Sequence, residues 1–144
     1  LLKAYYTRLM NQDPKIHKPA AQIFTKYEVG SSFHSPFIDF ESLLTQEKFV
    51  LGLARTETHY FMHQFFLNQN QILKNIEKIC FIPCKIIHGR YDAICPFEGA
   101  YKLSKALPKA ELKIINQGGH SSLDEKISEA LVHACQEFIH ILSP

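Results

Sequence analysis

Hydrophobic side chains recur at helical spacing through the first half of the chain. The stretch "DPKIHKPAAQIFTKYE" (residues 13–28) begins with Asp-Pro, which is typical of a helix start, and Pro19 is expected to kink that helix or split it in two. The stretch "TQEKFVLGLARTETHYFMHQFFLN" (residues 45–68) predicts a long amphipathic helix with Thr45 as its N-cap and an incomplete capping box. Residues 1 to about 79 are therefore predicted to be mostly helical.

Two shorter stretches complete this helical region. "VGSSFHSPF" (residues 29–37) is rich in Gly, Ser and Pro, and this composition predicts a loop between the two longer helices. "NQILKNIEKI" (residues 70–79) predicts one further short helix before the pattern changes.

From residue 80 onward the hydrophobic pattern alternates between short strands and helices. The predicted elements are a strand over 84–88 ("CKIIH"), a helix over 97–107 ending at Pro108, a strand over 110–116 ("AELKIIN") and a closing amphipathic helix over 124–142. This order is typical of α/β proteins and predicts two parallel strands joined by a crossover helix. A parallel pair normally has neighbouring strands and covered faces, so we expect this sheet to be incomplete.

Charge and cysteine content narrow the functional classes. The net charge of +2 is small and no run of Lys and Arg concentrates it, so we do not expect a nucleic-acid partner. No apolar run approaches the roughly 20 residues of a membrane span, so a membrane partner is not expected either. The 4 cysteines form no C-x-x-C pair and no secretory signal is visible, which favours reduced thiols, acting mostly as apolar filler, in a cytoplasmic protein.

The candidate chemistry lies in the turns that follow the two predicted strands. Asp92 follows the first strand and His120 follows the second. Because the carboxyl ends of parallel strands meet at the same edge of a sheet, these two side chains are expected to lie close together. A carboxylate that orients an imidazole is the acid–base half of a nucleophilic triad. The alternative is that Asp92 caps the helix after Pro96 and that His120 is an ordinary loop histidine.

Several segments together resemble a known enzyme family. "IPCKIIHGRYDAICP" and "LPKAELKIINQGGHSS" resemble the C-terminal portion of proline iminopeptidases (prolyl aminopeptidases), which are serine peptidases of the α/β-hydrolase fold. "LARTETHYF" and "AAQIFTKYEVG" are similar to parts of the helical cap of that family. The resemblance implies a cap region over residues 1–79, followed over residues 80–144 by the C-terminal part of an α/β hydrolase.

The resemblance also implies roles for four residues. Asp92 matches the triad acid and His120 the triad base, while Glu28 and Glu57 match the cap carboxylates that hold the free N-terminal amine of the substrate. Glu57 lies in an apolar helical stripe, where its carboxylate is expected either to meet a cation or to face a cavity. The alternatives are a salt bridge from Glu57 to a basic side chain such as Arg55, and simple solvation of Glu28 at its helix end.

The nucleophile of such an enzyme is missing from the sequence. No G-x-S-x-G elbow occurs anywhere in the chain, and no Gly-rich segment suggests an oxyanion hole. Loss of the nucleophile alone typically costs about 10⁶-fold in rate in a serine hydrolase. We therefore expect a C-terminal portion of a proline iminopeptidase that is inactive alone, acts on peptides with an N-terminal proline only when completed, and needs no metal or organic cofactor.

Two other functional readings remain open. The chain would be a non-catalytic binding or interaction module if a truncated hydrolase kept its cap and lost its chemistry. His59 and His63 stand at the i, i+4 spacing of helical metal ligands, but the general-base glutamate of H-E-x-x-H and an obvious third ligand are lacking, so metal binding is the weakest reading. In any of these cases, the exposed strand edge near residues 85–88 is expected to pair with a second copy of the chain or with an N-terminal hydrolase half.

Overall fold

The computed structural model describes residues 1–34 and 39–142 of the chain, and residues 35–38 and 143–144 lie outside it. The described residues form two compact units. Among the described residues, the first unit draws on 1–30 and 39–70, and the second on 31–34 and 71–142. Residues 71–79, placed in the helical region by the sequence pattern, thus group with the α/β segment.

The first unit is helical, as the hydrophobic pattern predicts. Its elements are α1 (Leu2–Leu9), α2 (Pro14–Ser32), α3 (Phe40–Thr45), α4 (Glu47–Met62) and a short turn, η1 (Gln64–Phe66). Its core contains Leu9, Ala20, Ala21, Phe24, Val50 and Ala54. Two polar contacts support this packing, because the Thr25 hydroxyl donates to the carbonyl of Val50 at 3.1 Å and Arg55 Nε donates to the carbonyl of Leu9 at 2.8 Å.

Helix α2 is not split at Pro19 and extends further than the sequence pattern predicts. It is one helix through Pro19, which lies near its start and removes only a single intrahelical hydrogen bond. It also continues to Ser32, so the loop predicted from Val29 onward is wrong for its first four residues. The buried side chain of Val29 shows that packing outweighs the weak helix propensity of the Gly-Ser-Ser that follows. The predicted loop's residues 35–37 lie outside the described residues.

The long helix predicted over residues 45–68 is shorter at both ends. Thr45 ends α3, and its hydroxyl donates to the carbonyl of Ser42 at 2.7 Å, so the predicted N-cap role is wrong and Gln46 takes that position. After Met62 the chain turns through three residues with positive φ, Gln64, Phe65 and Phe66 (51°, 56° and 56°). Such left-handed backbone is uncommon for side chains of this size, and composition gives no sign of it.

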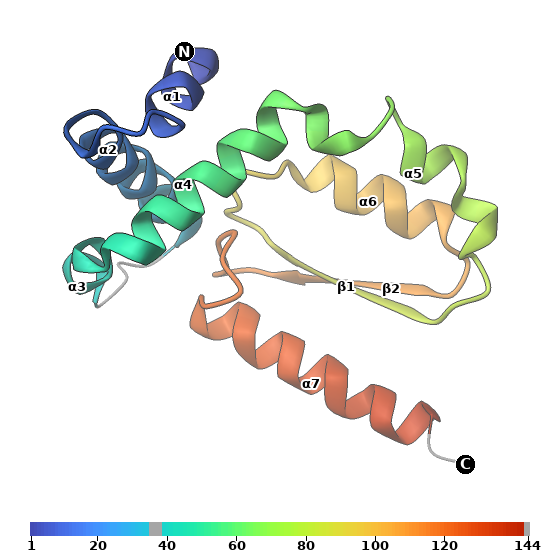
Figure 1. The fold of residues 1–144 in the computed structure, drawn as a ribbon. Helices are drawn as coiled ribbons and strands as arrows, with labels where there is room; N and C mark the ends of the chain where they lie inside the picture. Colours follow the sequence, from blue (N-terminus) through green and yellow to red (C-terminus); the bar gives the residue numbers. More distant parts are fainter. Residues whose placement is uncertain (35–38, 143–144) are drawn as a thin grey trace. The chain divides into compact units, whose positions relative to one another are not determined.

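The second unit contains the predicted parallel strand pair. Its main elements are β1 (Cys84–Gly89), α6 (Phe97–Ala106), β2 (Ala110–Ile115) and α7 (Glu125–Leu142), preceded by the short α-helix α5 (Gln71–Lys74) and the 3₁₀ turn η2 (Ile76–Lys78). The strands are parallel, with a register that runs from Cys84 opposite Ala110 to Gly89 opposite Ile115. Helices α6 and α7 cover opposite faces of the pair (Figure 1). The predicted α/β fold class is confirmed, and the helix predicted over residues 70–79 is present as the short α-helix α5 followed by the 3₁₀ turn η2.

Helix α7 is joined to the sheet by an apolar face and by one ion-pair cluster. Its buried side chains are Ile127, Ala130 and Ala134. Lys85 Nζ in β1 lies 2.7 Å from a Glu137 carboxylate oxygen in α7 and 2.8 Å from one of Glu111 in β2. Over the described part of the chain, β1 and β2 pair only with each other, and no helix there has the length and apolarity to cross a membrane.

Candidate active site

Two loops meet where the parallel strands end. Beyond β1, the Arg90 N–H donates to the carbonyl of Ile115 at 2.9 Å and the Tyr91 N–H donates to the carbonyl of Gly118 at 3.0 Å. Gly89 permits this approach, because a Cβ at that position would lie 2.5 Å from the Gly118 carbonyl oxygen. The loop after β1 is thus hydrogen-bonded to the loop after β2. This contact places Asp92 beside His120.

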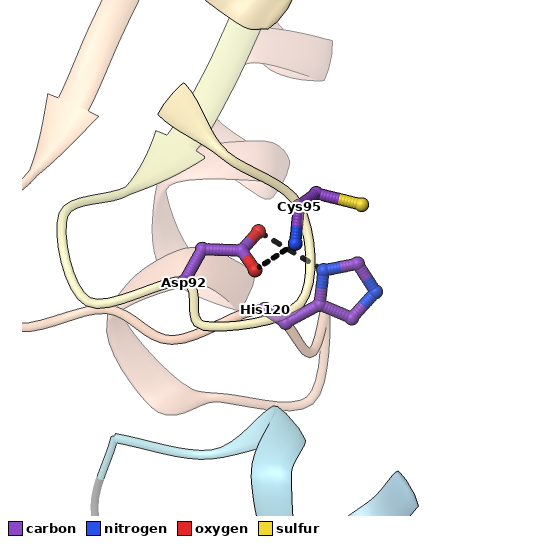
Figure 2. A group of neighbouring side chains, drawn as sticks. All are labelled: Asp92, Cys95 and His120. Carbon is purple, nitrogen blue, oxygen red and sulfur yellow. Dashed lines mark hydrogen bonds and ion pairs between the residues drawn. The ribbon is translucent and has the colours of Figure 1, made fainter. Parts of the chain in front are cut away.

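The two carboxylate oxygens of Asp92 have separate partners (Figure 2). Asp92 Oδ1 accepts the backbone N–H of Ile94 at 2.9 Å and that of Cys95 at 2.7 Å. Asp92 Oδ2 lies 2.9 Å from His120 Nδ1. The Asp92 side chain is only 6% exposed, whereas that of His120 is 37% exposed, so the carboxylate is shielded and the imidazole remains accessible.

The charge state of Asp92 fixes the role of each imidazole nitrogen. Burial acts to raise the pKa of the Asp92 carboxyl, but the hydrogen bonds from Cys95, His120 and Ile94 together outweigh it and lower the pKa below its ordinary value of 3.8. Asp92 is therefore an anion at neutral pH and can only accept hydrogen bonds. His120 must then carry its proton on Nδ1, which leaves Nε2 with the lone pair that a general base needs.

The backbone around His120 is held by groups that the sequence analysis did not identify. The carbonyl of Ser32, at the end of α2, accepts the N–H groups of His120 and Ser121, both at 2.8 Å. Asp124 Oδ2 accepts the Gly119 N–H at 3.2 Å from within the same loop. A Cβ at Gly119 would lie 2.7 Å from the Ser32 carbonyl oxygen. The available sequence signal for Asp124 was its place just before α7, where acidic capping residues are common.

A second histidine lies beside the carboxylate and was also missed. His88, in β1, places Nε2 3.9 Å from Asp92 Oδ2 with its side chain only 11% exposed. Its ring stands edge-on to that of Phe97, with 5.8 Å between the centroids. No hydrogen-bond partner of His88 Nε2 occurs in the described residues. The sequence reads "KIIHG", where His88 looks like the end of a strand and nothing marks it as a neighbour of the candidate acid.

The two predicted amine-binding carboxylates both belong to the first unit. Glu28 lies in α2 and lines a pocket of about 350 Å³ whose other walls are apolar or aromatic, among them Tyr5, Phe24 and Phe61. Glu57 is half-buried in α4, and its Oε2 atom is shielded from solvent. The guanidinium of Arg55 is directed to the carbonyls of Leu9 and Asn11. The amine-binding roles of Glu28 and Glu57 stay predictions.

The possible metal ligands fall in two places. The rings of His59 and His63 do face each other, with 4.4 Å between their centroids, and His63 Nδ1 lies 2.7 Å from the carbonyl oxygen of His59. The only group of three potential donors found among the described residues is Asp92, Cys95 and His120.

All four cysteines are free, and Cys95 and Cys135 are exposed, so the expectation of apolar filler is wrong for these two. Although Cys95 is exposed as a residue, partial removal of its thiol from water, followed by the nearby Asp92 charge, raises the pKa of the thiol.

One parallel strand is followed by a carboxylate, and the next is followed by a histidine that is hydrogen-bonded to that carboxylate. This arrangement is that of the C-terminal part of an α/β hydrolase. The comparisons with known proteins agree. The chain belongs to a family described as TAP-like protein, whose family model matches residues 68–141, just over half of the chain.

Curated relatives extend the similarity to nearly the whole chain. It is 40% identical over 135 residues to a proline iminopeptidase from Arabidopsis thaliana, covering 93% of this chain and 36% of the relative. It is 36% identical to a probable proline iminopeptidase from Leptolyngbya boryana and 38% identical to a proline iminopeptidase from Xylella fastidiosa, covering 96% of this chain in both cases and 44% and 45% of the relatives. The resemblance seen in the sequence is confirmed, and the chain spans less than half the length of these relatives.

Proposed function

We propose that this chain supplies the acid–base pair and the amine-binding carboxylates of a peptidase that releases N-terminal proline from peptides. The observation that carries the proposal is the 2.9 Å contact between Asp92 Oδ2 and His120 Nδ1 at the end of a parallel strand pair. The similarity to relatives named proline iminopeptidases supports the substrate class. The seryl nucleophile and the oxyanion hole would come from outside this sequence, which contains no G-x-S-x-G elbow.

Each residue then has a defined task. His120 Nε2 accepts the proton of the attacking serine and later returns it to the departing amine of the peptide. Asp92 holds the ring in the Nδ1–H form and stabilises the imidazolium that forms in the transition state. Glu28 and Glu57 bind the ammonium group of the substrate's first residue, which restricts cleavage to the free N-terminus.

Hydrolysis of proline β-naphthylamide by the purified chain, with and without a co-expressed N-terminal half from a related hydrolase, tests this proposal. We expect activity only with the added half, and a loss of about 10⁴-fold or more for Asp92→Asn and His120→Gln. His133→Gln, at an exposed histidine of α7, is the matched control and should retain the activity. Activity of the chain alone would refute the assigned division of labour, as would inactivity of a stable, folded complex of the two halves.

The pocket beside Glu28 favours one alternative function. A pocket with apolar walls and one carboxylate is suited to an ammonium group attached to an apolar side chain, and it is formed within the first unit alone. The chain would then be a binding module for amino-terminal residues, without chemistry of its own. Prolinamide binding to the isolated chain, weakened about tenfold or more by Glu28→Gln, together with inactivity of the reconstituted complex, would favour this alternative over the peptidase.

A further inference from the structure

We propose that Asp92, Cys95 and His120 form a binding site for a divalent ion that accepts sulfur ligands, with Zn²⁺ as the best match. In this proposal, the bound ion prevents Asp92 and His120 from acting as an acid–base pair. One donor atom from each residue lies within 4.8 Å of the other two. Figure 2 shows the three residues as neighbours, with Asp92 and Cys95 from the loop after β1 and His120 from the loop after β2. The regulatory part of this proposal rests on the proposed function, whereas the binding site does not.

The local backbone fixes the positions of two of the three ligand residues relative to each other. Asp92 and Cys95 belong to one tight turn, which is held because Asp92 Oδ1 accepts the Cys95 N–H at 2.7 Å. That contact leaves Asp92 Oδ2 directed to His120. The Cys95 residue is exposed and its thiol is in no disulfide. An ion arriving from solvent would therefore meet a thiol, an imidazole and a carboxylate already held near one another.

The mixture of donors selects the class of metal. Zn²⁺ accepts thiolate, imidazole and carboxylate ligands in tetrahedral sites, with bonds of about 2.0 to 2.3 Å that place neighbouring donor atoms about 3.3 to 3.8 Å apart. The donor atoms of the three residues lie up to 4.8 Å apart, so they must move about 1 Å closer to bind one ion. Rotations of the exposed Cys95 and His120 side chains can bring them together. Ca²⁺ and Mg²⁺ prefer sites made of oxygen ligands, so a thiol and an imidazole disfavour them.

Metal binding and proton transfer exclude each other at this site. An ion bound to a ring nitrogen of His120 occupies a lone pair, and an ion bound to Asp92 Oδ2 competes with the hydrogen bond that orients the ring. With three protein ligands, the fourth tetrahedral position stays open to water. The bound ion would thus inhibit the proposed peptidase reversibly, and a chelator would restore the activity.

The binding site is tested on the chain itself, without reference to activity. Titration with Zn²⁺ by calorimetry should give one ion per chain, and Co²⁺ should produce tetrahedral ligand-field bands together with a thiolate charge-transfer band. Cys95→Ser should abolish the charge-transfer band and weaken Zn²⁺ binding by at least about tenfold, and His120→Ala should weaken it similarly. Circular dichroism of each variant verifies that it is folded.

Two matched controls locate the ion. Cys135→Ser removes another exposed thiol, on α7, and His59→Ala disrupts the histidine pair of α4, so neither should change the affinity or the bands. Absence of Zn²⁺ binding, retention of the charge-transfer band in Cys95→Ser, or its loss in Cys135→Ser would overturn the assignment. In the reconstituted peptidase, Zn²⁺ should inhibit the wild type at lower concentration than Cys95→Ser, each relative to its own rate. Equal sensitivity would overturn the regulatory part alone.

Discussion

The two carboxylate oxygens of Asp92 contact different groups, and together these contacts hold the side chain in place. One carboxylate oxygen receives two backbone N–H groups of its own turn, and the other receives the imidazole. The backbone contacts hold the carboxylate at a fixed angle, so that the orientation of His120 does not depend on a mobile side chain. The sequence allowed two readings of this residue, a local turn cap and a partner of His120. The structure combines them, because Asp92 stabilises its own turn with the oxygen that His120 does not use.

The lowered pKa of Asp92 predicts a pH-dependent contribution to stability. The folded-state pKa lies below the ordinary value of 3.8, so the contribution is fully present above about pH 4 and is lost as the pH falls through the folded-state pKa. In Asp92→Asn, only the amide oxygen can accept hydrogen bonds, because the NH₂ group is a donor. The side chain therefore cannot accept from both the backbone N–H groups and the Nδ1–H of His120, as the carboxylate does. We expect a loss of about 1 to 3 kcal/mol at pH 7.

Urea unfolding of wild type and Asp92→Asn between pH 7 and pH 2 measures this effect. The difference in unfolding free energy should shrink on acidification and be small below the folded-state pKa. A difference that stays constant across this range would mean that the Asp92 charge contributes nothing, and that the variant is destabilised by altered packing.

At the scale of elements, the site depends on two loops that approach more closely than side chains allow. Gly89 ends β1 against the carbonyl of Gly118, and Gly119 lies against the carbonyl of Ser32. In the sequence, Gly118 and Gly119 stand directly before His120, a pattern that by itself indicates only a sharp turn. The structure shows that these glycines serve close backbone contact, since no glycine in the described residues has a positive φ.

Gly89→Ala is therefore expected to destabilise the second unit and to move Asp92 away from His120. The new methyl group would meet backbone atoms, which cannot rotate aside, and such overpacking costs about 1 to 3 kcal/mol. Gly99→Ala is the control, because its methyl group meets nothing within 4 Å in helix α6 and should be neutral or stabilising by up to about 1 kcal/mol. Thermal or urea unfolding of both variants measures the contrast, and equal stabilities would contradict the close-approach argument.

The elements that periodicity predicted well are those with one clear apolar face. Both strands, α6 and α7 lie within a few residues of their predicted ranges. The predictions failed where local chemistry competed with packing: Val29 is buried and extends α2 through a Gly-Ser stretch, while Thr45 bonds backward to Ser42 and caps nothing. The neighbours of the candidate site were invisible for another reason. His88 is only four residues from Asp92, but the end of a strand followed by a turn has no fixed contact at that spacing. The contact of the Ser32 carbonyl with the His120 N–H is made by the tertiary fold, which neither spacing nor composition encodes.

At the scale of the whole molecule, the sheet formed by the described residues is smaller than is usual for a parallel sheet. Two parallel strands with a helix on each face form the described sheet, whereas parallel sheets normally continue on both sides. Coverage of less than half of each relative is consistent with further strands in a complete hydrolase. Pairing of β1 with a separate hydrolase half, or with a second copy of this chain, is the partner arrangement that we propose for this edge.

The alternation of the β1 backbone makes that edge observable by amide hydrogen exchange. The N–H groups of Cys84 and Arg90 donate toward the β2 side, at 3.2 and 2.9 Å. Because successive residues of a strand point their amides to opposite sides, those of Lys85, Ile87 and Gly89 face the other edge. Alone in solution, the strand should therefore exchange deuterium in an every-other-residue pattern, slow toward β2 and fast at the bare edge. Uniform slow exchange along β1 would show that a neighbouring strand has already closed it.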